Sequence, residues 1–275
     1  MKEGPSVKFQ DSFERRVASP NVARGVVLLI HGITASPREM EPLAEHLVSQ
    51  KFNVIVPRLP GHEGDFNTLR RTRAELWIAE AEQLFANLRR STPNLPIFVV
   101  GASFGALLAL HLTATYRTEI VAVALVAPAV KLRSSLDEYA LQILSLFPES
   151  FLDRLPVSTK KKRLMNYLTF PREAYEQHSL GALARLMQIR KRLFRRSRDI
   201  VTPVLIIQDP NDHLLSRDAW QLIVEKISSP CVKVSLFPGG QHELTLGHCY
   251  RDVNREIGDF FESVEQCESD SCHAK

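Results

Sequence analysis

The stretch VVGASFGALLALHL, residues 99–112, decides the fold that we expect for this chain. It begins in an apolar, β-branched run that ends at Gly101, and it continues as the alanine and leucine series of a buried helix. Ser103 lies between Gly101 and Gly105, where the strand gives way to the helix. A G-x-S-x-G pattern in this context predicts a tight, strained turn that exposes the serine hydroxyl as a nucleophile.

Short apolar runs of the same kind recur along the chain, and they are continuous rather than alternating, as in strands buried on both faces of a parallel sheet. Helix-like segments separate them, and this alternation predicts a doubly wound, mostly parallel α/β sheet. The runs are residues 25–31, 53–56, 97–102, 120–127, 203–208 and 232–237, and the helical segments are 36–50, 73–90, 104–116, 216–227 and 250–264.

One long interval interrupts the alternation. Residues 131–200 contain no convincing buried strand, and they carry 15 Lys and Arg against 7 Asp and Glu. We expect them to form a helical lid inserted before the strand that starts near Pro203. Residues 1–130 and 201–265 would then form the α/β core, and residues 266–275, which are acidic and rich in serine, a disordered tail.

Composition excludes several classes of protein. The net charge of +4 is too small to indicate nucleic-acid binding. The four cysteines form no CxxC pair, so neither a metal site nor a disulfide framework is expected. The chain has no apolar run of about 18 residues and no secretory h-region, and a cytoplasmic location is expected.

A serine nucleophile needs a carboxylate that follows it in the chain. Asp209 and Asp212 both come after the apolar run 203–208. Asp209 stands at the end of the run and is better placed to cap the turn, whereas Asp212 lies far enough along to reach the site. We expect Asp212 to be the acid, and comparison of the two asparagine variants decides between them.

The nucleophile also needs a histidine base later in the chain. His242 follows the last apolar run in a glycine-containing loop, where parallel-sheet topology places the base. His213 stands before a helix, His248 opens the last helical segment and His273 lies in the tail, so we expect His242.

The oxyanion of such a reaction needs backbone N–H donors. The run 25–31 ends in His31 and Gly32, a turn that can direct the N–H of Ile33 toward the nucleophile. The N–H of Phe104, directly after Ser103, is the expected second donor.

The combined motifs resemble the α/β-hydrolase superfamily, and more narrowly the bacterial carboxylesterases and monoacylglycerol lipases. HGITASPREMEPLAEHL is similar to their HGFTGSP segment and VPRLPGHEGD to their PRLxGHG segment, although Glu63 replaces the second glycine. GASFG, IIQDPNDHLL and GGQHELTLG extend the resemblance over residues 24–264.

The resemblance implies an α/β-hydrolase fold with a lid at 131–200. It implies Ser103 as nucleophile, His242 as base, Asp212 as acid, and the amides of Ile33 and Phe104 as oxyanion donors. We expect hydrolysis of short- to medium-chain acyl esters, with monoacylglycerol as a candidate, through an acyl-enzyme and without a metal or organic cofactor.

Other hypotheses stay open on the same scaffold: a thioesterase, an amidase, a C–C hydrolase, or a ligand-binding protein without turnover. Apolar residues of the insertion could line an acyl pocket, and its basic residues could contact anionic lipid. These apolar residues are Leu136, Tyr139, Ile143, Phe147, Phe151 and Leu152. The sequence does not indicate an oligomeric state.

Overall fold

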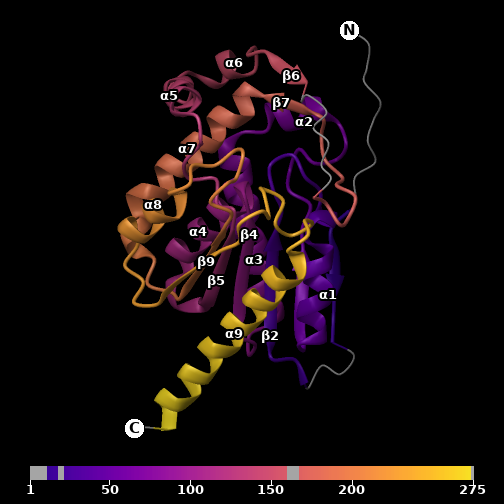
Figure 1. Ribbon diagram of the computed structural model, residues 1–275, viewed down its shortest axis with the longest axis vertical. Coiled ribbons are helices and arrows are strands. Elements are labelled where there is room, and N and C mark those ends of the chain that lie inside the picture. Colours follow the sequence, from indigo (N-terminus) through magenta and orange to yellow (C-terminus); the bar gives the residue numbers. More distant parts are fainter. Residues whose placement is uncertain (1–10, 18–21, 160–166, 274–275) are drawn as a thin grey trace.

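A twisted sheet with helices on both sides forms the centre of the computed structural model (Figure 1). The structure describes residues 11–17, 22–159 and 167–273, with side chains described up to residue 267 in the last helix. The resulting architecture is the α/β-hydrolase fold that the sequence predicts.

The central sheet has seven strands in the order β1-β3-β2-β4-β5-β8-β9. All neighbours are parallel except β1, which pairs antiparallel with β3 at one edge. The strands are β1 (Phe13–Arg15), β2 (Gly25–Ile30), β3 (Phe52–Val56), β4 (Ile97–Ala102), β5 (Ile120–Val126), β8 (Val204–Gln208) and β9 (Val232–Leu236). The six predicted strands are therefore confirmed, and β1 is an additional one.

Burial explains why the apolar runs are continuous. Every residue of β2, β4 and β8 is buried, because helices cover both faces of the sheet at these strands. By contrast, β3 alternates between buried and half-buried residues, and the edge strand β9 has no fully buried residue.

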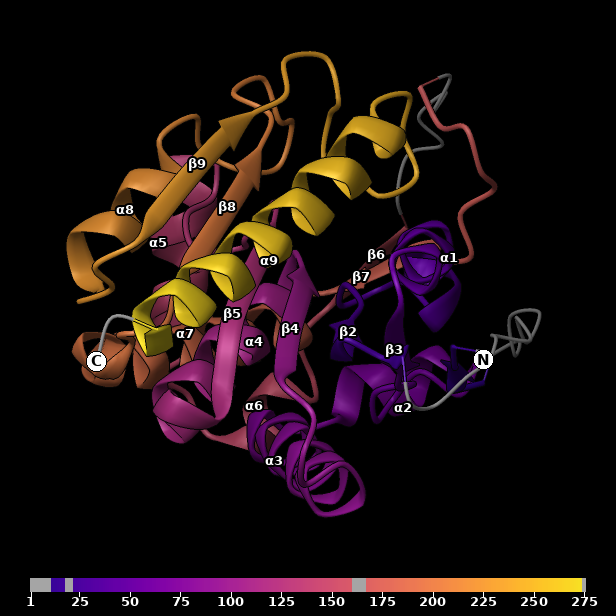
Figure 2. The same ribbon diagram turned by 90° about the horizontal axis from the view of Figure 1, so that it is seen from below.

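Helices cover the two faces of the sheet, as Figure 2 shows. On one face α1 (Glu41–Ser49) packs against α9 (Tyr250–His273), and on the other α3 (Ala74–Ser91), α4 (Phe104–Tyr116) and α7 (Leu180–Arg196) pack together. The remaining core helices are α2 (Phe66–Arg71) and α8 (Ala219–Lys226), with short 3-10 turns at Pro37–Met40, Arg117–Glu119 and Ser197–Asp199. Within the described ranges, no helix combines the length and apolarity needed to cross a membrane.

Between β5 and β8 lies the interval that breaks the alternation. It contains α5 (Ser135–Leu144), α6 (Glu149–Leu152), α7 and a small antiparallel pair, β6 (Val157–Thr159) and β7 (Gln177–Ser179). The sequence missed this pair, whose strands are three residues long. The helix α7 packs on α3 and α4, and α5 and α6 rest on α7 above the end of the sheet (Figure 1).

The division into core, lid and tail stays a prediction. The structure continues α9 to His273, within the range 266–275 for which a disordered tail was expected. Residues 274–275 lie outside the described residues.

Strand order determines where the site can form. From β2 the chain moves outward to β3 and then returns to β4 on the other side of β2. The carboxyl ends of β2 and β4 therefore face each other at a topological switch point, where doubly wound sheets bind ligands. The predicted oxyanion turn follows β2, and Ser103 follows β4.

Two glycines permit the turn between β4 and α4. A Cβ on Gly101 would lie 2.3 Å from the carbonyl oxygen of Gly105, and a Cβ on Gly105 would lie 2.1 Å from that of Ile30. Both obstacles are backbone atoms that no side-chain rotation can move. The helix α4 can start this close to β2 only because neither position has a side chain.

We predict that Gly105→Ala destabilises the protein by at least about 3 kcal/mol, because strand and helix must separate to accept the methyl group. Gly239→Ala is the control: its Cβ meets no atom within 4 Å, and only its positive φ of 87° opposes the change. The control should lose about 1–2 kcal/mol. Urea unfolding measures both variants, and an equal loss would contradict the close-approach account.

Candidate active site

Ser103 occupies the turn between β4 and α4 in a strained conformation. Its φ of 52° and ψ of −109° are rare for a residue with a side chain. Its N–H donates to the carbonyl of Val126, at the end of β5, over 2.8 Å. The turn is thereby fixed by the neighbouring strand, and the hydroxyl is half-buried above the end of the sheet.

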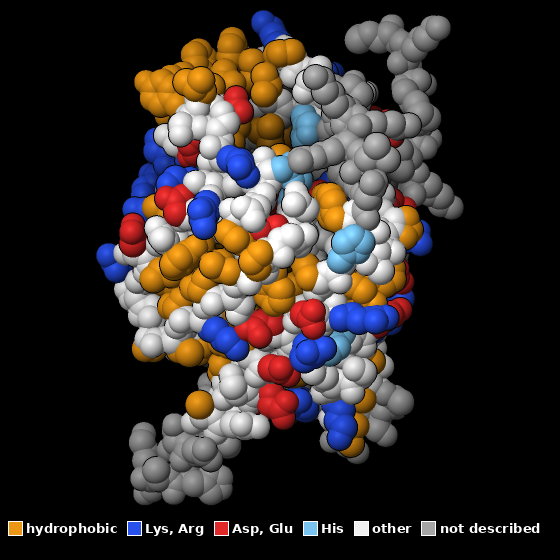
Figure 3. Space-filling model, in the orientation of Figure 1, with side chains coloured by type: hydrophobic (Ala, Val, Ile, Leu, Met, Phe, Trp, Pro, Cys, Tyr) orange, Lys and Arg blue, Asp and Glu red, His pale blue; other side chains and the backbone are white. Residues whose placement is uncertain are grey.

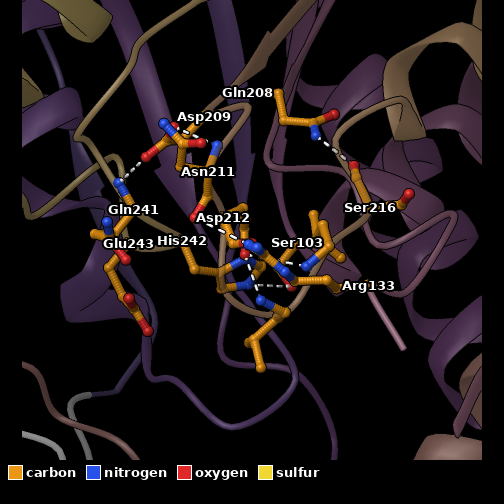
Figure 4. A network of polar contacts seen from close by, with 12 residues as sticks. Ser103, Arg133, Gln208, Asp209, Asn211, Asp212, Ser216, Gln241, His242 and Glu243 are labelled. Carbon is orange, nitrogen blue, oxygen red and sulfur yellow. Dashed lines mark hydrogen bonds and ion pairs between the residues drawn. The ribbon is translucent and has the colours of Figure 1, made fainter.

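A continuous hydrogen-bond chain joins Ser103, His242 and Asp212 (Figure 4). The Oγ of Ser103 lies 3.0 Å from Nε2 of His242, and Nδ1 of His242 lies 2.8 Å from Oδ2 of Asp212. A carboxylate can only accept, so Nδ1 carries the proton of the neutral ring and Nε2 accepts from the serine hydroxyl. The structure thus brings together the three residues that the sequence selected.

The two aspartates after β8 have different partners. Oδ1 of Asp212 accepts from the N–H of Leu214 at 2.7 Å and of Leu215 at 3.1 Å, which leaves Oδ2 for His242. Asp209 accepts from the N–H of Asn211 and of Gln241, each at 2.7 Å. Asp209 therefore holds the turn and the loop before His242, whereas Asp212 contacts the imidazole.

Electrostatics favours an imidazolium–carboxylate pair. Burial on its own raises the pKa of Asp212, but the His242 ring and the two backbone N–H groups outweigh it, and the pKa lies below its usual value. Burial likewise works to lower the pKa of His242, yet the Asp212 carboxylate and, more weakly, Glu243 leave it raised. The ring is therefore suited to take up a proton from Ser103.

Neither His213 nor His248 is part of the hydrogen-bond chain from Ser103 to Asp212. The ring of His213 lies 6.1 Å from that of His242, centroid to centroid, on the loop that carries Asp212. His248 is exposed. The side chain of His273 lies outside the described residues.

The turn after β2 is held from both sides. Gly32 donates its N–H to the buried carboxylate of Glu39 over 2.8 Å, and Nδ1 of His31 lies 2.9 Å from the Gly32 carbonyl. The N–H of Leu59 donates to Nε2 of His31 at 3.3 Å, so Nδ1 is the protonated nitrogen and donates to Gly32. Burial and the neighbouring His62 place the pKa of His31 well below its usual value, consistent with a neutral ring.

This arrangement orients the expected oxyanion donors. Because a peptide unit is planar and trans, fixing the carbonyl of Gly32 also fixes the N–H of Ile33 on its opposite side. Within the described ranges, the N–H groups of Ile33 and Phe104 make no hydrogen bond. Both amides therefore remain available for an oxyanion, and the amide of Phe104 also lies at the positive end of the α4 dipole.

Three supporting residues were not assigned a role from the sequence. Glu39 and His62 hold the turn after β2, the latter with Nε2 2.7 Å from the carbonyl of Ile33, and Arg133 donates to the carbonyl of Asp212 over 2.8 Å. His62 lay within the quoted GHE motif, which was the available signal. Glu39 and Arg133 act on residues that only the folded chain brings near them.

The substitution at Glu63 is accommodated at the surface. Its side chain is exposed and accepts the N–H of Gly61 at 3.2 Å. Gly61 and Gly64 adopt positive φ values of 87° and 98°, so the loop still has glycine at its two left-handed positions.

The apolar side chains of the insertion form a surface patch rather than an enclosed pocket. Leu136, Tyr139 and Leu146 are 84%, 67% and 69% exposed, and Figure 3 shows the hydrophobic cluster above α5 and α6. Only Leu152, of the six residues proposed for an acyl pocket, is buried. We define the insertion patch as Leu136, Tyr139, Ile143, Leu146, Phe147 and Phe151.

Many basic residues of the insertion are engaged within the protein. Arg185 is fully buried and pairs with Glu149 and Asp153, and Arg190 pairs with Glu138. These arginines join α7 to α5 and α6 instead of facing outward. The basic run at 160–163 lies outside the described residues.

Comparison with known proteins places the chain in a family. The family model for serine aminopeptidase, S33, matches residues 21–247. The chain is 27% identical over 222 residues to a thermostable monoacylglycerol lipase of Bacillus sp. (strain H-257), covering 81% of this chain and 84% of the relative.

Solved structures share the fold. One from a study of the metagenome-derived lipolytic enzymes LipS and LipT has a TM-score of 0.77 and 21% identity, covering 94% of this chain and 98% of the other. A soluble variant of monoglyceride lipase from Saccharomyces cerevisiae, solved with a substrate analogue, has a TM-score of 0.77 and 15% identity, covering 94% and 96%.

We predict that Asp212→Asn lowers the pKa of His242 by about one to two units, because it removes the adjacent negative charge. Asp209→Asn is the matched control and should lower it less. NMR titration of ring-labelled histidine measures both. A larger decrease in the Asp209 variant would show that the acid has been misassigned.

Proposed function

The chain belongs to the serine aminopeptidase S33 family and is a carboxylic ester hydrolase, and we propose that it cleaves acyl esters through Ser103, His242 and Asp212. The observation that carries this proposal is the unbroken hydrogen-bond chain from the Ser103 hydroxyl to the Asp212 carboxylate. A serine hydroxyl is a weak nucleophile until an oriented base accepts its proton. The position of His242 beside Ser103 supports its proposed role as this base.

The proposed reaction has two similar halves. Nε2 of His242 takes the Ser103 proton as Oγ attacks the ester carbonyl carbon, and the imidazolium then donates this proton to the departing alcohol. The acyl group stays on Ser103. Water, deprotonated by His242, attacks the acyl-enzyme, and the proton returns to Ser103 as the carboxylic acid leaves.

The amides of Ile33 and Phe104 are the proposed oxyanion donors. Each tetrahedral intermediate places negative charge on the former carbonyl oxygen, which needs donors already in position. The turn after β2 is fixed by His31 and Glu39, and the Phe104 amide by the start of α4. A donor of this kind contributes roughly 2.7–4 kcal/mol to transition-state stabilisation.

Peptide hydrolysis, suggested by the family's description, is less well supported by the site. An aminopeptidase has to bind a positively charged substrate amine, which calls for a carboxylate available to it. Glu39 and Glu243 are the buried glutamates beside the site, and they are engaged by the Gly32 amide and by the Arg172 guanidinium. We therefore favour esters over peptides.

The proposed substrates are short- to medium-chain acyl esters, with monoacylglycerol as one candidate. The monoacylglycerol lipase of Bacillus sp. matches most of the chain and supports this choice. The insertion patch suits contact with a lipid phase, because a cluster of exposed apolar side chains loses its contact with water there. We propose that this patch holds the protein at aggregated or membrane-bound ester.

We predict that the wild type releases p-nitrophenol from p-nitrophenyl butyrate and is labelled by a fluorophosphonate. Ser103→Ala should abolish the labelling and lower kcat about 10⁶-fold. Ser229→Ala, at a partly exposed serine between α8 and β9, is the control and should behave as wild type. An active Ser103→Ala protein would refute the proposed nucleophile.

We predict that the double variant Leu136→Ser and Leu146→Ser loses activity on dispersed monoacylglycerol while keeping its activity on soluble p-nitrophenyl acetate. The reason is that the patch contacts the lipid phase but not the reacting atoms. Val201→Ser and Val224→Ser, at exposed apolar positions outside the patch, form the matched control. Equal losses on both substrates, or none, would remove the patch from the account.

A further inference from the structure

One segment of the insertion touches both halves of the site. We call residues 167–175 the strap. Near its start, the Thr169 N–H donates to the carbonyl of Leu246 over 2.7 Å, in the segment that follows His242. At its end, the Tyr175 N–H donates to the carbonyl of Thr34 over 2.8 Å, in the turn that carries Ile33.

Isolated bridges reinforce both attachments. Leu168 pairs with Gly247, and Ala174 pairs with Ala35, both antiparallel. The strap is therefore hydrogen-bonded through its backbone to the base-bearing loop at one end and to the oxyanion turn at the other.

A charged residue lies between these attachments. Nη1 of Arg172 lies 2.7 Å from Oε1 of Glu243, whose side chain is 1% exposed and which directly follows His242. The hydroxyl of Tyr167, also on the strap, donates to Oε2 of the same carboxylate. Both oxygens of Glu243 are thus engaged by the strap.

A second buried carboxylate lies within the field of Arg172. Glu39 holds the Gly32 amide, and burial raises its pKa while Arg172 works in the opposite direction. An uncompensated carboxylate beside the oxyanion turn would oppose the negative charge that develops in the reaction. The positive charge of Arg172, which acts on both Glu39 and Glu243, partly offsets this unfavourable effect of the carboxylates.

We propose that Arg172 is a positioning residue for the hydrolysis: its ion pair with Glu243 fixes the loop of His242 and offsets the carboxylates of Glu243 and Glu39 beside the reacting groups. This inference rests on the proposed function. Arg172 contacts neither Ser103 nor His242 by a hydrogen bond in the described part of the chain. Arg172 would therefore act on the site through its ion pair with Glu243 and through the electrostatic effect of its positive charge.

The two members of the ion pair shift the pKa of His242 in opposite directions, and this affects the pH dependence of the reaction. The Glu243 carboxylate raises the pKa of His242, and the Arg172 guanidinium lowers it. The acidic limb of kcat/KM reports the base of the free enzyme, which has to be neutral to accept a proton. In the part of the chain that the structure describes, the charged and titratable groups around the His242 ring are Asp212, His213, Glu39, Glu243 and Arg172.

The test compares the pH profiles of kcat/KM for the single and double variants of the Arg172–Glu243 pair, measured with soluble p-nitrophenyl butyrate. Arg172→Met should move the acidic limb of kcat/KM to higher pH by about one unit, and Glu243→Gln should move it to lower pH by a similar amount. The double variant, which removes the ion pair as a unit, should return the limb close to wild type. Arg172→Lys, which keeps the charge, should also stay close.

Arg192→Met is the control, since Arg192 lies on the same insertion and forms a half-exposed ion pair with Glu75 of α3. It should leave the limb unmoved. Circular dichroism verifies that each variant is folded. If Arg172→Met is unfolded, the pH profiles of Glu243→Gln and of the double variant still test the proposal. If the acidic limb of kcat/KM does not move, or moves in the same direction in both single variants, the proposal is wrong.

Fluorophosphonate labelling distinguishes a wrong role for Arg172 from a wrong proposed function. If the wild type is labelled by a fluorophosphonate at Ser103 while the limbs stay in place, the esterase assignment stands and the role of Arg172 is wrong. If the wild type is neither labelled nor active, the proposed function itself is wrong, and Arg172 has no hydrolysis to assist.

Discussion

The close approach of α4 to β2 and β4 is the constraint on which the rest of the site depends. Side chains at Gly101 or Gly105 would collide with backbone carbonyls of the turn and of β2. With glycine at both positions, the chain reverses within one residue and Ser103 takes a positive φ. The same compact turn exposes the serine hydroxyl, and among the described residues the first amide of α4 beside it has no hydrogen-bond partner. The proposed nucleophile and one proposed oxyanion donor therefore have one structural cause.

Parallel topology brings the remaining groups to this turn. The oxyanion turn, Ser103, Asp212 and His242 follow β2, β4, β8 and β9, and all four strands end at one edge of the sheet. Loops at strand ends are mobile unless they are held. Here they are held by buried polar groups, with Glu39 and His31 on the oxyanion turn, Asp209 before His242, and the Arg172–Glu243 pair after it. The strap joins the insertion to the loop of His242 and to the turn of Ile33 through backbone hydrogen bonds.

The sequence predicted the parts of this structure that depend on local pattern. Continuous apolar runs predicted β2, β4, β5 and β8, because burial on both faces leaves no polar alternation. Apolar runs also predicted β3 and β9, although these strands are less completely buried. Chain order and strand ends selected Ser103, Asp212 and His242. Contacts between distant segments were missed: Arg172 and Glu243 are adjacent only after folding, and β6 and β7 are too short to leave a pattern. The amphipathic face of α5 was one candidate lining for an acyl pocket but is exposed, because periodicity shows that a face is apolar and not what covers it.

The central claim is that the Ser103 hydroxyl becomes acylated during turnover. The most direct measurement is peptide mass spectrometry of enzyme that has been acid-quenched while turning over p-nitrophenyl trimethylacetate, an ester whose crowded acyl group leaves slowly. We expect the trimethylacetyl group on the peptide that contains Ser103, and it should appear there at the rate of the p-nitrophenol burst. Turnover with the acyl group on another residue, or a burst with Ser103 unmodified, would contradict it.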